Sequence, residues 1–421
     1  MKGGAGGAPP LSAGLNLRLS LMMFLQYAIW GAWLPLFYPF LTGHRMLTPA
    51  QAGQLFALAA SGALLAPFVA GQIADRWFNT ERFLAISHLA GAALVWRLAT
   101  VESFGGLCLL AFLYSLLYAP TIPLTNSLAF HHLPDRDRDF GRVRLWGTLG
   151  WIAVGIGFAQ WLRAVYSPGR LHEGMADMFR LSAALGVVLA AYSLTLPATP
   201  PQRGRMKFAP FEAMRDFFRA PRTNPLFWLF VITFPVACVH QFYFVHTAGF
   251  LQSIEAESAA IDRVFGMGGG GLMTIGQMAE IVVLACMPLL ARRIARKGLL
   301  TIGLLAYVVR FAVFASAPHA CAVIPALALH GLCFGCYVFV AFMIVDEETT
   351  PDVRASAQGL FNLVVIGFGI IVGNLFAGEV ASAAAKEGGG TDYGMLFAVP
   401  MAVAAGCLVA LRLFYPRARA A

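Results

Sequence analysis

Charged side chains are scarce in this sequence. Asp, Glu, Lys and Arg together make up 12% of its 421 residues, whereas apolar residues make up 59% and the mean hydropathy is +0.70. A soluble domain carries about 25% charged and about 45–50% apolar residues. A water-soluble fold of this length could not bury so much apolar side chain, so much of the surface must face lipid. The composition therefore excludes a soluble globular protein and predicts an integral membrane protein.

Motifs for enzyme chemistry are missing as well. The sequence has no G-x-x-x-x-G-K-[ST] motif, which excludes a P-loop for ATP. Its seven cysteines all fall inside apolar runs, which argues against a disulfide framework, and the C-x-x-C pair Cys333 and Cys336 lies in a predicted span rather than after a strand. His132 and Asp137 match the H-x-x-x-x-D pattern of some membrane acyltransferases, but so short a pattern is common by chance. We expect no enzyme activity, no cofactor and no bound metal.

Long apolar runs divide the chain into membrane-spanning segments. A span needs about 20 mostly apolar residues, and the sequence has twelve such runs, with a polar gap at 198–224 that holds six basic residues. Two sets of six runs on either side of one basic gap are the layout of two parallel repeats joined by a cytoplasmic loop. We therefore predict an all-α integral membrane fold with two six-helix bundles, residues 1–197 and 225–421. The predicted spans are 17–41, 51–74, 83–101, 104–129, 145–165, 179–197, 225–253, 267–290, 299–317, 320–345, 354–380 and 393–415.

The basic residues indicate the orientation of these spans. If both termini are inside, 22 of the 30 Lys and Arg residues fall in inside segments and 6 in outside segments. Cytoplasmic loops carry such an excess, so we predict a multi-pass protein with N-in and C-in termini. The same placement in short gaps argues against a nucleic-acid partner, despite the net charge of +9. The remaining two, Arg97 and Arg310, lie inside spans at corresponding points of the two halves, and we interpret both as structural.

One carboxylate stands out in the middle of a predicted span. Glu280 lies near the centre of 267–290, and Gln277 is one helical turn earlier on the same face. A charged side chain at the bilayer centre costs roughly 2.5–3.5 kcal/mol on insertion scales, so such residues usually face a polar cavity. Apolar surroundings favour the protonated carboxyl, which suits reversible proton uptake. The alternative is a structural carboxylate paired to a neighbouring helix.

Other polar residues in the spans could bind a ligand. Arg144 and Thr148 share a helix face at the start of the fifth span, where a guanidinium with five fixed donors suits substrate hydroxyls or the Glu280 carboxylate. Arg144 could instead be an ordinary membrane anchor. Gln241 of the seventh span could bind a ligand or bridge two helices. His330 and Phe334 share a face of the tenth span, and the histidine could relay protons, donate to substrate or simply pack.

Two motifs resemble the major facilitator superfamily. Gly71-Gln-Ile-Ala-Asp75-Arg76 with Arg82 is similar to the loop between the second and third spans of that superfamily, and residues 292–297 form a weaker second copy. The resemblance implies a role for Gly71, Asp75 and Arg76 in conformational switching.

A closer resemblance is to the bacterial nucleoside:proton symporter family. It rests on FLQYAIWGAWL (24–34), YAPTIPLTNS (118–127), RLWGTLG (144–150), the Gln277 and Glu280 pair, and RASAQG (354–359). It implies proton-driven nucleoside uptake across the inner membrane by alternating access, with nucleoside and protons as substrates and no cofactor. By the same resemblance Arg144, Thr148, Gln241, Gln277 and Glu280 line the central cavity, Glu280 and Arg144 couple the proton, and Phe334 is the aromatic residue of the tenth span.

The chain departs from that family pattern at three positions. Gly335 stands where an acidic residue is expected, His330 where a tyrosine is expected, and Phe244 where a polar residue is expected. FGRVR at 140–144 also resembles the oligosaccharide:proton symporters, so a sugar symporter remains an alternative. A transporter-like sensor is the third hypothesis. We expect a monomer in the lipid bilayer.

Overall fold

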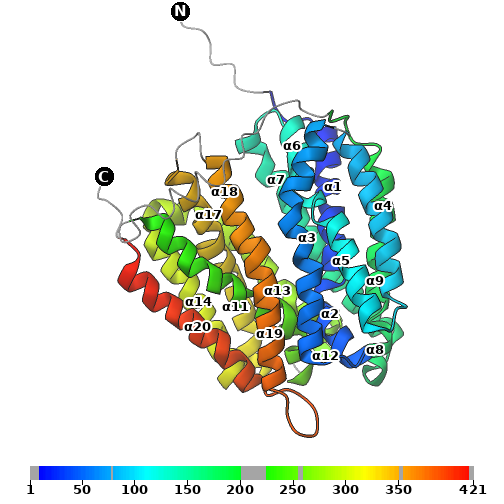
Figure 1. Ribbon diagram of the computed structural model, residues 1–421, viewed down its shortest axis with the longest axis vertical. Coiled ribbons are helices and arrows are strands. Elements are labelled where there is room, and N and C mark those ends of the chain that lie inside the picture. Colours follow the sequence, from blue (N-terminus) through cyan, green and yellow to red (C-terminus); the bar gives the residue numbers. More distant parts are fainter. Residues whose placement is uncertain (1–8, 77–78, 201–223, 255–258, 350–353, 417–421) are drawn as a thin grey trace, which may run out of the picture.

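The computed structural model describes residues 9–76, 79–200, 224–254, 259–349 and 354–416. In these residues the secondary structure is helical, and the β-type pairing is limited to an isolated bridge between Ala385 and Thr391. A helix or a row of consecutive helices occupies each of the twelve predicted runs (Figure 1). The run predicted at 225–253 has the same bounds in the structure. The all-α fold predicted from the sequence is therefore confirmed.

The helices follow the order of the predicted spans. Several spans consist of two or more consecutive helices that are broken near a proline, or contain a π-helical segment (η1, η3, η4). The first half contains α1 (Ala13–Gly31), α2 (Leu34–Pro39), η1 (Phe40–His44), α3 (Pro49–Arg76), α4 (Thr80–Leu98), α5 (Phe104–Tyr118), α6 (Thr121–His132), α7 (Arg136–Val165), η2 (Pro168–Arg170), α8 (Leu171–Gly174) and α9 (Asp177–Ser193). The second half contains α11 (Pro225–Ser253), α12 (Ala259–Phe265), α13 (Gly270–Arg293), α14 (Arg296–Ser316), α15 (Ala320–Leu327), α16 (Leu329–Leu332), η3 (Cys333–Phe339), α17 (Val340–Glu347), α18 (Arg354–Asn362), η4 (Leu363–Gly369), α19 (Ile370–Ala383) and α20 (Tyr393–Phe414).

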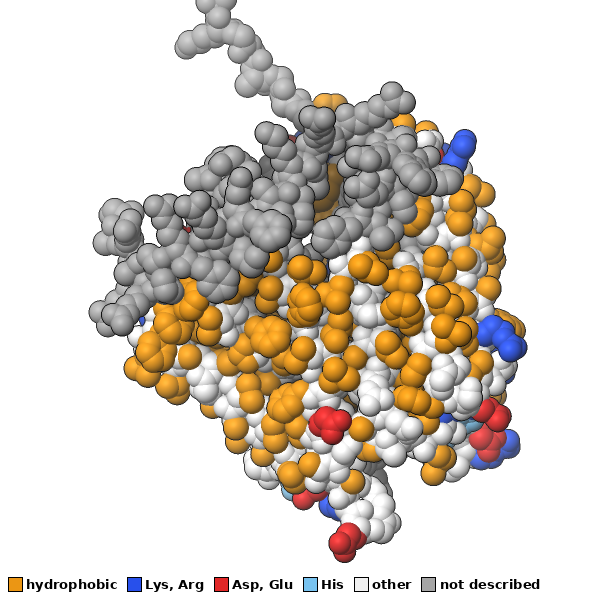
Figure 2. Space-filling view, in the orientation of Figure 1, with side chains coloured by type: hydrophobic (Ala, Val, Ile, Leu, Met, Phe, Trp, Pro, Cys, Tyr) orange, Lys and Arg blue, Asp and Glu red, His pale blue; other side chains and the backbone are white. Residues whose placement is uncertain are grey.

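Most of these helices are suited to a bilayer. Among the described residues, nine segments are long and apolar enough to cross a membrane, or ten if the bent row of η2, α8 and α9 counts as one span. The two other predicted spans are α3 and α4, and α4 contains the charged residues Glu81, Arg82 and Arg97. Apolar side chains cover much of the described surface in Figure 2, whereas charged side chains gather toward its edges. The chain is a multi-pass membrane protein.

Side-chain caps begin several of the helices. Ser12, Ser103, Asp135, Asn224 and Asp392 each accept a hydrogen bond from a backbone N–H group in the first turn of the helix that follows. The first four N–H groups of a helix have no partner within the helix, and these residue types are the preferred acceptors for them. The caps therefore mark helix starts that hydropathy alone places only within several residues.

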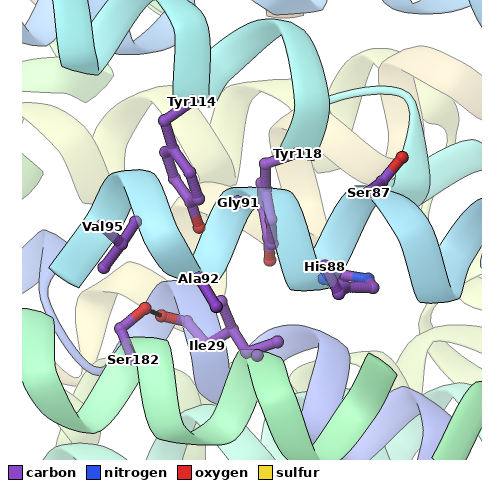
Figure 3. A pocket seen from close by; sticks show the side chains of 10 residues that line it. Ile29, Ser87, His88, Gly91, Ala92, Val95, Tyr114, Tyr118 and Ser182 are labelled. Carbon is purple, nitrogen blue, oxygen red and sulfur yellow. Dashed lines mark hydrogen bonds between the residues drawn. The ribbon is translucent and has the colours of Figure 1, made fainter. Parts of the chain in front are cut away.

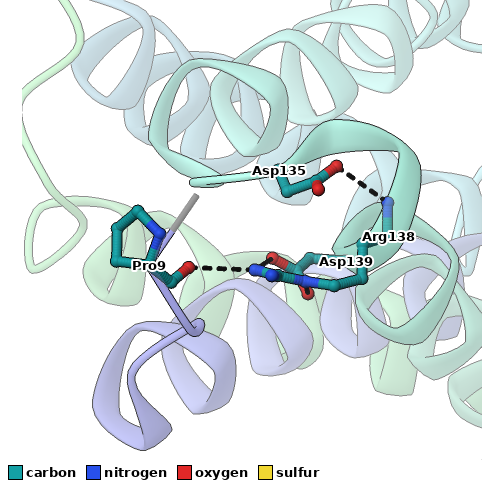
Figure 4. Close-up of polar contacts among 4 residues, drawn as sticks. All are labelled: Pro9, Asp135, Arg138 and Asp139. Atoms are coloured by element: carbon teal, nitrogen blue, oxygen red, sulfur yellow. Dashed lines mark hydrogen bonds and ion pairs between the residues drawn. The ribbon is translucent and has the colours of Figure 1, made fainter. Parts of the chain in front are cut away.

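The start of α7 is tied to the residues that precede α1 (Figure 4). The Asp135 carboxylate accepts a hydrogen bond from the backbone N–H of Arg138 at 3.1 Å. The Arg138 guanidinium pairs with the Asp139 carboxylate, with 2.8 Å between Nη2 and Oδ2, and donates to the carbonyl oxygen of Pro9 at 2.9 Å. These contacts place the starts of α1 and α7 at the same end of the molecule, and the two helices pack against each other.

Helix packing is most extensive within each half. In the first half α1 packs on α7, α3 on α5 and α4 on α9, and in the second half α14 packs on α20, α11 on α19 and α13 on α16. Contacts between the halves join α3 to α19, α7 to α13 and α2 to α11. Residues 201–223 of the predicted central loop lie outside the described residues, so the division at 198–224 stays a prediction.

The two halves are hydrogen bonded at the end of the molecule opposite the N-terminus, where α2, α8 and α12 lie (Figure 1). The Gln160 side-chain amide on α7 donates to the carbonyl oxygen of Arg263 on α12 at 2.9 Å. The backbone N–H of Met267 donates to the carbonyl oxygen of Ala159 at 3.1 Å. These bonds close the molecule at what we term the far end.

A close contact between two glycines also closes the far end. A Cβ atom on Gly53 of α3 would lie 2.8 Å from Cα of Gly378 on α19 and 2.7 Å from the carbonyl oxygen of Asn374. We expect Gly53→Leu to force the halves apart there and to lower the melting temperature in detergent, since overpacking costs about 1–3 kcal/mol. Gly105→Leu is the control, because the space around Gly105 is open. Equal melting temperatures for Gly53→Leu and the control would contradict the close contact.

Candidate functional site

Helices α13 and α16 approach each other backbone to backbone beside Glu280. A Cβ atom on Gly331 would lie 2.5 Å from the carbonyl carbon of Ala279 and 2.7 Å from the backbone nitrogen of Glu280. On the other helix, a Cβ atom on Gly276 would lie 2.9 Å from Cβ of His330. No residue larger than glycine fits at these two positions without moving a helix. The two glycines therefore bring the Glu280 carboxyl and the His330 imidazole together.

A line of three side chains runs into the second half. It begins at the partly exposed Glu280, continues through His330 and ends at Arg310. The Oε2 atom of Glu280 is 3.9 Å from Nε2 of His330, and the Nη1 atom of Arg310 is 3.1 Å from Nδ1 of the same imidazole. The Glu280 side chain is 15% exposed, His330 is 1% exposed and Arg310 is fully buried. The carboxyl is therefore the member of this line that a ligand or water can reach.

Arg310 is surrounded by aromatic rings. Its guanidinium carbon lies 4.6 Å from the ring centroid of Tyr243, 5.2 Å from that of Tyr307 and 4.8 Å from that of Phe311. Its Nε and Nη2 groups have no hydrogen-bond partner in the described part of the chain. Arg97, the corresponding residue of the first half, is exposed. The structural interpretation suits Arg97, whereas the contact of Arg310 with His330 connects Arg310 to the candidate site.

The two predicted glutamines are buried, and Gln277 precedes Glu280 by one turn of α13. Gln241 on α11 is 7% exposed and Gln277 on α13 is 6% exposed. The side-chain oxygen of Gln277 has no hydrogen-bond partner among the described residues, although buried polar atoms usually have one. The neighbouring His240 ring stacks on His330 at 5.3 Å, and its Nδ1 is 2.5 Å from the hydroxyl of Tyr307. The free Gln277 oxygen can accept a hydrogen bond from a ligand.

Arg144 and Thr148 lie on α7, the helix of the first half that packs against α13. Both are half-buried and one turn apart on α7. The guanidinium carbon of Arg144 lies 4.0 Å from the ring centroid of Tyr27 on α1, and the side chain makes no hydrogen bond to any residue that the structure describes. It makes no ion pair with Glu280, which lies on the helix α13 that packs against α7. The donors of Arg144 are thus available to a ligand.

Aromatic rings connect the two halves beside these polar groups. Trp30 on α1 and Trp151 on α7 meet edge to face at 5.5 Å, and Trp151 is 6.3 Å from Phe244 on α11. Phe244 in turn meets the His330 ring at 5.7 Å. Phe334 lies half-buried in the π-helical segment η3 and has no ring contact with a described aromatic residue. Phe334 therefore has ring surface that is not used in packing against other described rings, whereas Trp30 packs against both Trp151 and Tyr118.

Gly335 has no room for the acidic side chain expected from the family resemblance. A Cβ atom there would lie 2.5 Å from Cγ1 of Val283 on α13. We expect Gly335→Asp to lower the melting temperature, because the added side chain must displace the Val283 side chain or α13 itself. Adding Val283→Ala removes the clashing methyl groups and should recover part of the lost stability. A Gly335→Asp protein that melts with the wild type would show that α13 can move at no cost.

A second buried polar cluster surrounds Gln26 in the first half. The side-chain nitrogen of Gln26 donates to Thr121 Oγ1 at 2.8 Å, its side-chain oxygen is 2.9 Å from His88 Nε2, and the Tyr118 hydroxyl donates to its backbone carbonyl at 2.6 Å. A cavity of about 10 Å³ beside it is lined by His88, Tyr114 and Tyr118 (Figure 3), room for about one water molecule. No sequence pattern points to this cluster, because its members come from separate runs.

The motif that resembles the switching loop forms the end of a helix. Gly71, Asp75 and Arg76 lie in the last turns of α3, and their side chains lie outside the described residues. At the weaker second copy, Arg296 on α14 pairs with Glu347 on α17 at 2.5 Å. The described part of the chain contains no group of three or more His, Cys, Asp or Glu side chains that could hold a metal ion.

Comparisons with known proteins find a family model and several transporters that are similar to this chain. A family model described as Nucleoside H+ symporter matches residues 13–419. The putative nucleoside transporter YegT of Escherichia coli (strain K12) is 32% identical over 373 residues, which cover 86% of this chain and 83% of that protein. Nucleoside permease NupG of Escherichia coli (strain K12) is 25% identical over 384 residues, which cover 89% of this chain and 90% of that protein.

Solved structures share the fold. A crystal structure of a mutant of the nucleoside transporter NupG has a TM-score of 0.85 at 24% identity and covers 96% of this chain and 100% of that one. A bacterial homolog of the human lysosomal transporter Spinster, in an inward-facing and unoccupied conformation, has a TM-score of 0.73 at 19% identity and covers 97% of this chain and 98% of that one. These likenesses confirm the predicted fold class, that of the major facilitator superfamily.

Proposed function

This chain belongs to the nucleoside H+ symporter family, and we propose that it carries nucleosides together with protons into the bacterial cell across the inner membrane. Membership of a transporter family agrees with the prediction that the chain is not an enzyme. The observation that carries the proposal is the position of Glu280, a partly exposed carboxyl in the middle of a span, on the helix α13 that packs against α7 of the other half, which carries Arg144.

In this mechanism Glu280 is the proton carrier. The ionised carboxylate attracts Arg144 across the space between the halves, and protonation removes that attraction. Arg144 is then free to donate to substrate, which makes nucleoside binding depend on the proton. The five donors of the guanidinium match the hydroxyl groups of a ribose.

We propose that the other predicted residues bind the nucleoside. Gln241 and Gln277 carry amide groups that pair with the polar edge of a base or with ribose, and the Gln277 oxygen has no other partner among the described residues. Thr148 lies one turn from Arg144 on the same face. His330 is a further donor, and Phe334 has free ring surface on which a base can stack.

With the proposed N-in and C-in orientation, we propose that this structure is closed on its outer side. With both termini in the cytoplasm, the far end lies on the outer side of the membrane, and the hydrogen bonds around Gln160 and Met267 close that side. Opening the far end and closing the other exposes Glu280 to the outside, which is alternating access. Gly71, Asp75 and Arg76 then lie on the cytoplasmic side, where the predicted switch acts. We propose that a single chain performs the cycle.

A proton-coupled sugar symporter is the second candidate. The pair of Trp30 and Trp151 at 5.5 Å offers rings that pack on a sugar face, and FGRVR at 140–144 provides Arg144 for sugar hydroxyls. A transporter-like sensor would use the same groups to bind a ligand without moving it.

Uptake of labelled uridine into proteoliposomes tests the proposal. We expect accumulation when an inward proton gradient is imposed, and competition by other nucleosides but not by sugars. Competition by maltose instead of nucleosides would favour the sugar symporter. Uridine binding without counterflow exchange would favour the sensor and contradict transport.

A further inference from the structure

Arg310 is a buried cation that has no acidic side chain in direct contact among the described residues. It is fully buried, and its nearest polar contact is the His330 imidazole at 3.1 Å. A buried charge is costly unless other groups compensate it. The aromatic rings around the guanidinium offset part of that cost, and the carboxyl of Glu280 lies on the far side of the imidazole at 3.9 Å. The charge of Arg310 is therefore linked to Glu280 through His330.

The contact with Arg310 determines which ring nitrogen of His330 carries a proton. A guanidinium has five N–H donors, no acceptor, and keeps its proton in proteins. The Nη1 group must donate to Nδ1, so Nδ1 must be the unprotonated acceptor. A neutral imidazole with an unprotonated Nδ1 carries its hydrogen on Nε2, the nitrogen that faces the Glu280 carboxyl.

The same contact prevents His330 from taking up a proton. An added proton could enter the ring only at Nδ1, where it would point at the Nη1–H of Arg310. The other titratable groups that face His330 are the stacked His240 and Tyr243 rings from α11 and Glu280 from α13. Neither ring from α11 brings a negative charge that would stabilise an imidazolium.

We propose that Arg310 is a positioning residue that holds His330 as a neutral hydrogen-bond donor directed at Glu280, so that Glu280 alone carries the proton. The Nε2–H group donates to the ionised carboxylate when the 3.9 Å gap shortens, and to substrate when the carboxyl is protonated. This assignment replaces the interpretation of Arg310 as structural, and it excludes His330 as a proton relay.

Nitrogen-15 NMR of histidine-labelled protein tests the assignment without a substrate. The sequence has nine histidines, and the His330→Gln spectrum identifies the missing signal. We expect the wild-type signal to stay that of the neutral Nε2–H form between about pH 5 and 8, where an ordinary histidine changes its charge. In Arg310→Met the donor is lost, and the signal should move to a mixture of ring forms or to the imidazolium. An imidazolium signal in the wild type, or an unchanged signal in Arg310→Met, would overturn the proposal.

Transport of uridine gives a second test, which rests on the proposed function. We expect Arg310→Met to lower the rate of gradient-driven accumulation by about 10-fold or more, because a charge-assisted hydrogen bond to the site is lost, and Arg310→Lys, which keeps a cationic donor, to recover part of it. Arg97→Met is the matched control, since Arg97 is exposed at the corresponding point of the first half. Equal losses in Arg310→Met and Arg310→Lys, with counterflow lost as well, would indicate a packing role and contradict the proposal.

Two variants of His330 distinguish a donor from a proton carrier. A glutamine side chain can accept from Arg310 and donate toward Glu280, but it cannot carry a proton. We therefore expect His330→Gln to transport less than the wild type yet still accumulate uridine above equilibrium, and His330→Phe to lose accumulation. Loss in both would make His330 a proton carrier. If the wild type does not transport uridine at all, the proposed function is wrong, while the NMR result still decides the role of Arg310.

Discussion

Uridine accumulation driven by a proton gradient should disappear when Glu280 is replaced by glutamine. Glutamine keeps the size and hydrogen-bonding capacity of a protonated glutamate but can neither gain nor lose a proton. A gradient of one pH unit is worth about 1.4 kcal/mol, or about tenfold accumulation at one proton for each nucleoside. We expect proteoliposomes with the wild-type protein to approach that ratio, and those with Glu280→Gln to stop at equal concentrations on both sides.

Exchange of uridine without net proton movement separates coupling from binding. Counterflow should continue in Glu280→Gln, because the neutral side chain imitates the proton-loaded carrier. Glu379→Gln is the control, since Glu379 is exposed on α19 and makes no described contact. Gradient-driven accumulation that survives in Glu280→Gln would assign the proton to another group and remove the main support for the mechanism.

The fold was predictable because hydropathy is a local property. Each apolar run is long enough to be recognised alone, and the helix α11 begins and ends where the run at 225–253 does. A charged side chain inside an apolar span is costly and therefore rare, so Glu280 could be singled out from the sequence without knowledge of its neighbours. The central loop is likewise predicted from composition, but its residues 201–223 lie outside the described part of the chain.

The contacts of the site depend on helix approach, which no single run reveals. Gly276 and Gly331 read as ordinary glycines in the sequence, yet they bring α13 within backbone contact of α16 and so place His330 beside Glu280. The α-helical period predicts that His330 and Phe334 share a face. The segment η3 is π-helical from Cys333 onward, and a π-helix has more residues in each turn than an α-helix, so α-helical spacing does not apply there.

The two arginines within spans also show that a single run of sequence does not reveal a residue's neighbours. Arg97 and Arg310 occupy corresponding positions in two similar sequence segments, so the sequence predicts one role for both. In the structure one is exposed and the other fully buried against an imidazole. Duplication preserves the position of a residue along a helix, whereas the neighbouring helices determine what that residue does.

Substrate affinity should fall sharply when Arg144 is replaced by alanine. The guanidinium is half-buried, stacked on Tyr27 at 4.0 Å and without a hydrogen bond to any described residue, so its donors are held in place for a ligand. Each hydrogen bond from a charged donor contributes about 1.5–3 kcal/mol, and the loss of one raises the Kd for uridine by about 10- to 100-fold. Titration calorimetry in detergent measures this directly. Arg144→Lys should give an intermediate Kd, because an ammonium keeps the charge but not the planar fork of donors.

Arg142 provides a close control for this experiment. It lies two residues earlier on α7 and is exposed, so Arg142→Ala removes the same charge from the same helix without touching the site. We expect the Kd of Arg142→Ala to match that of the wild type. Equal weakening in both variants would mean that Arg144 acts only through the positive charge of this helix end. In that event its place near Glu280 would reflect membrane anchoring, and the nucleoside would have to be bound mainly by Gln241 and Gln277.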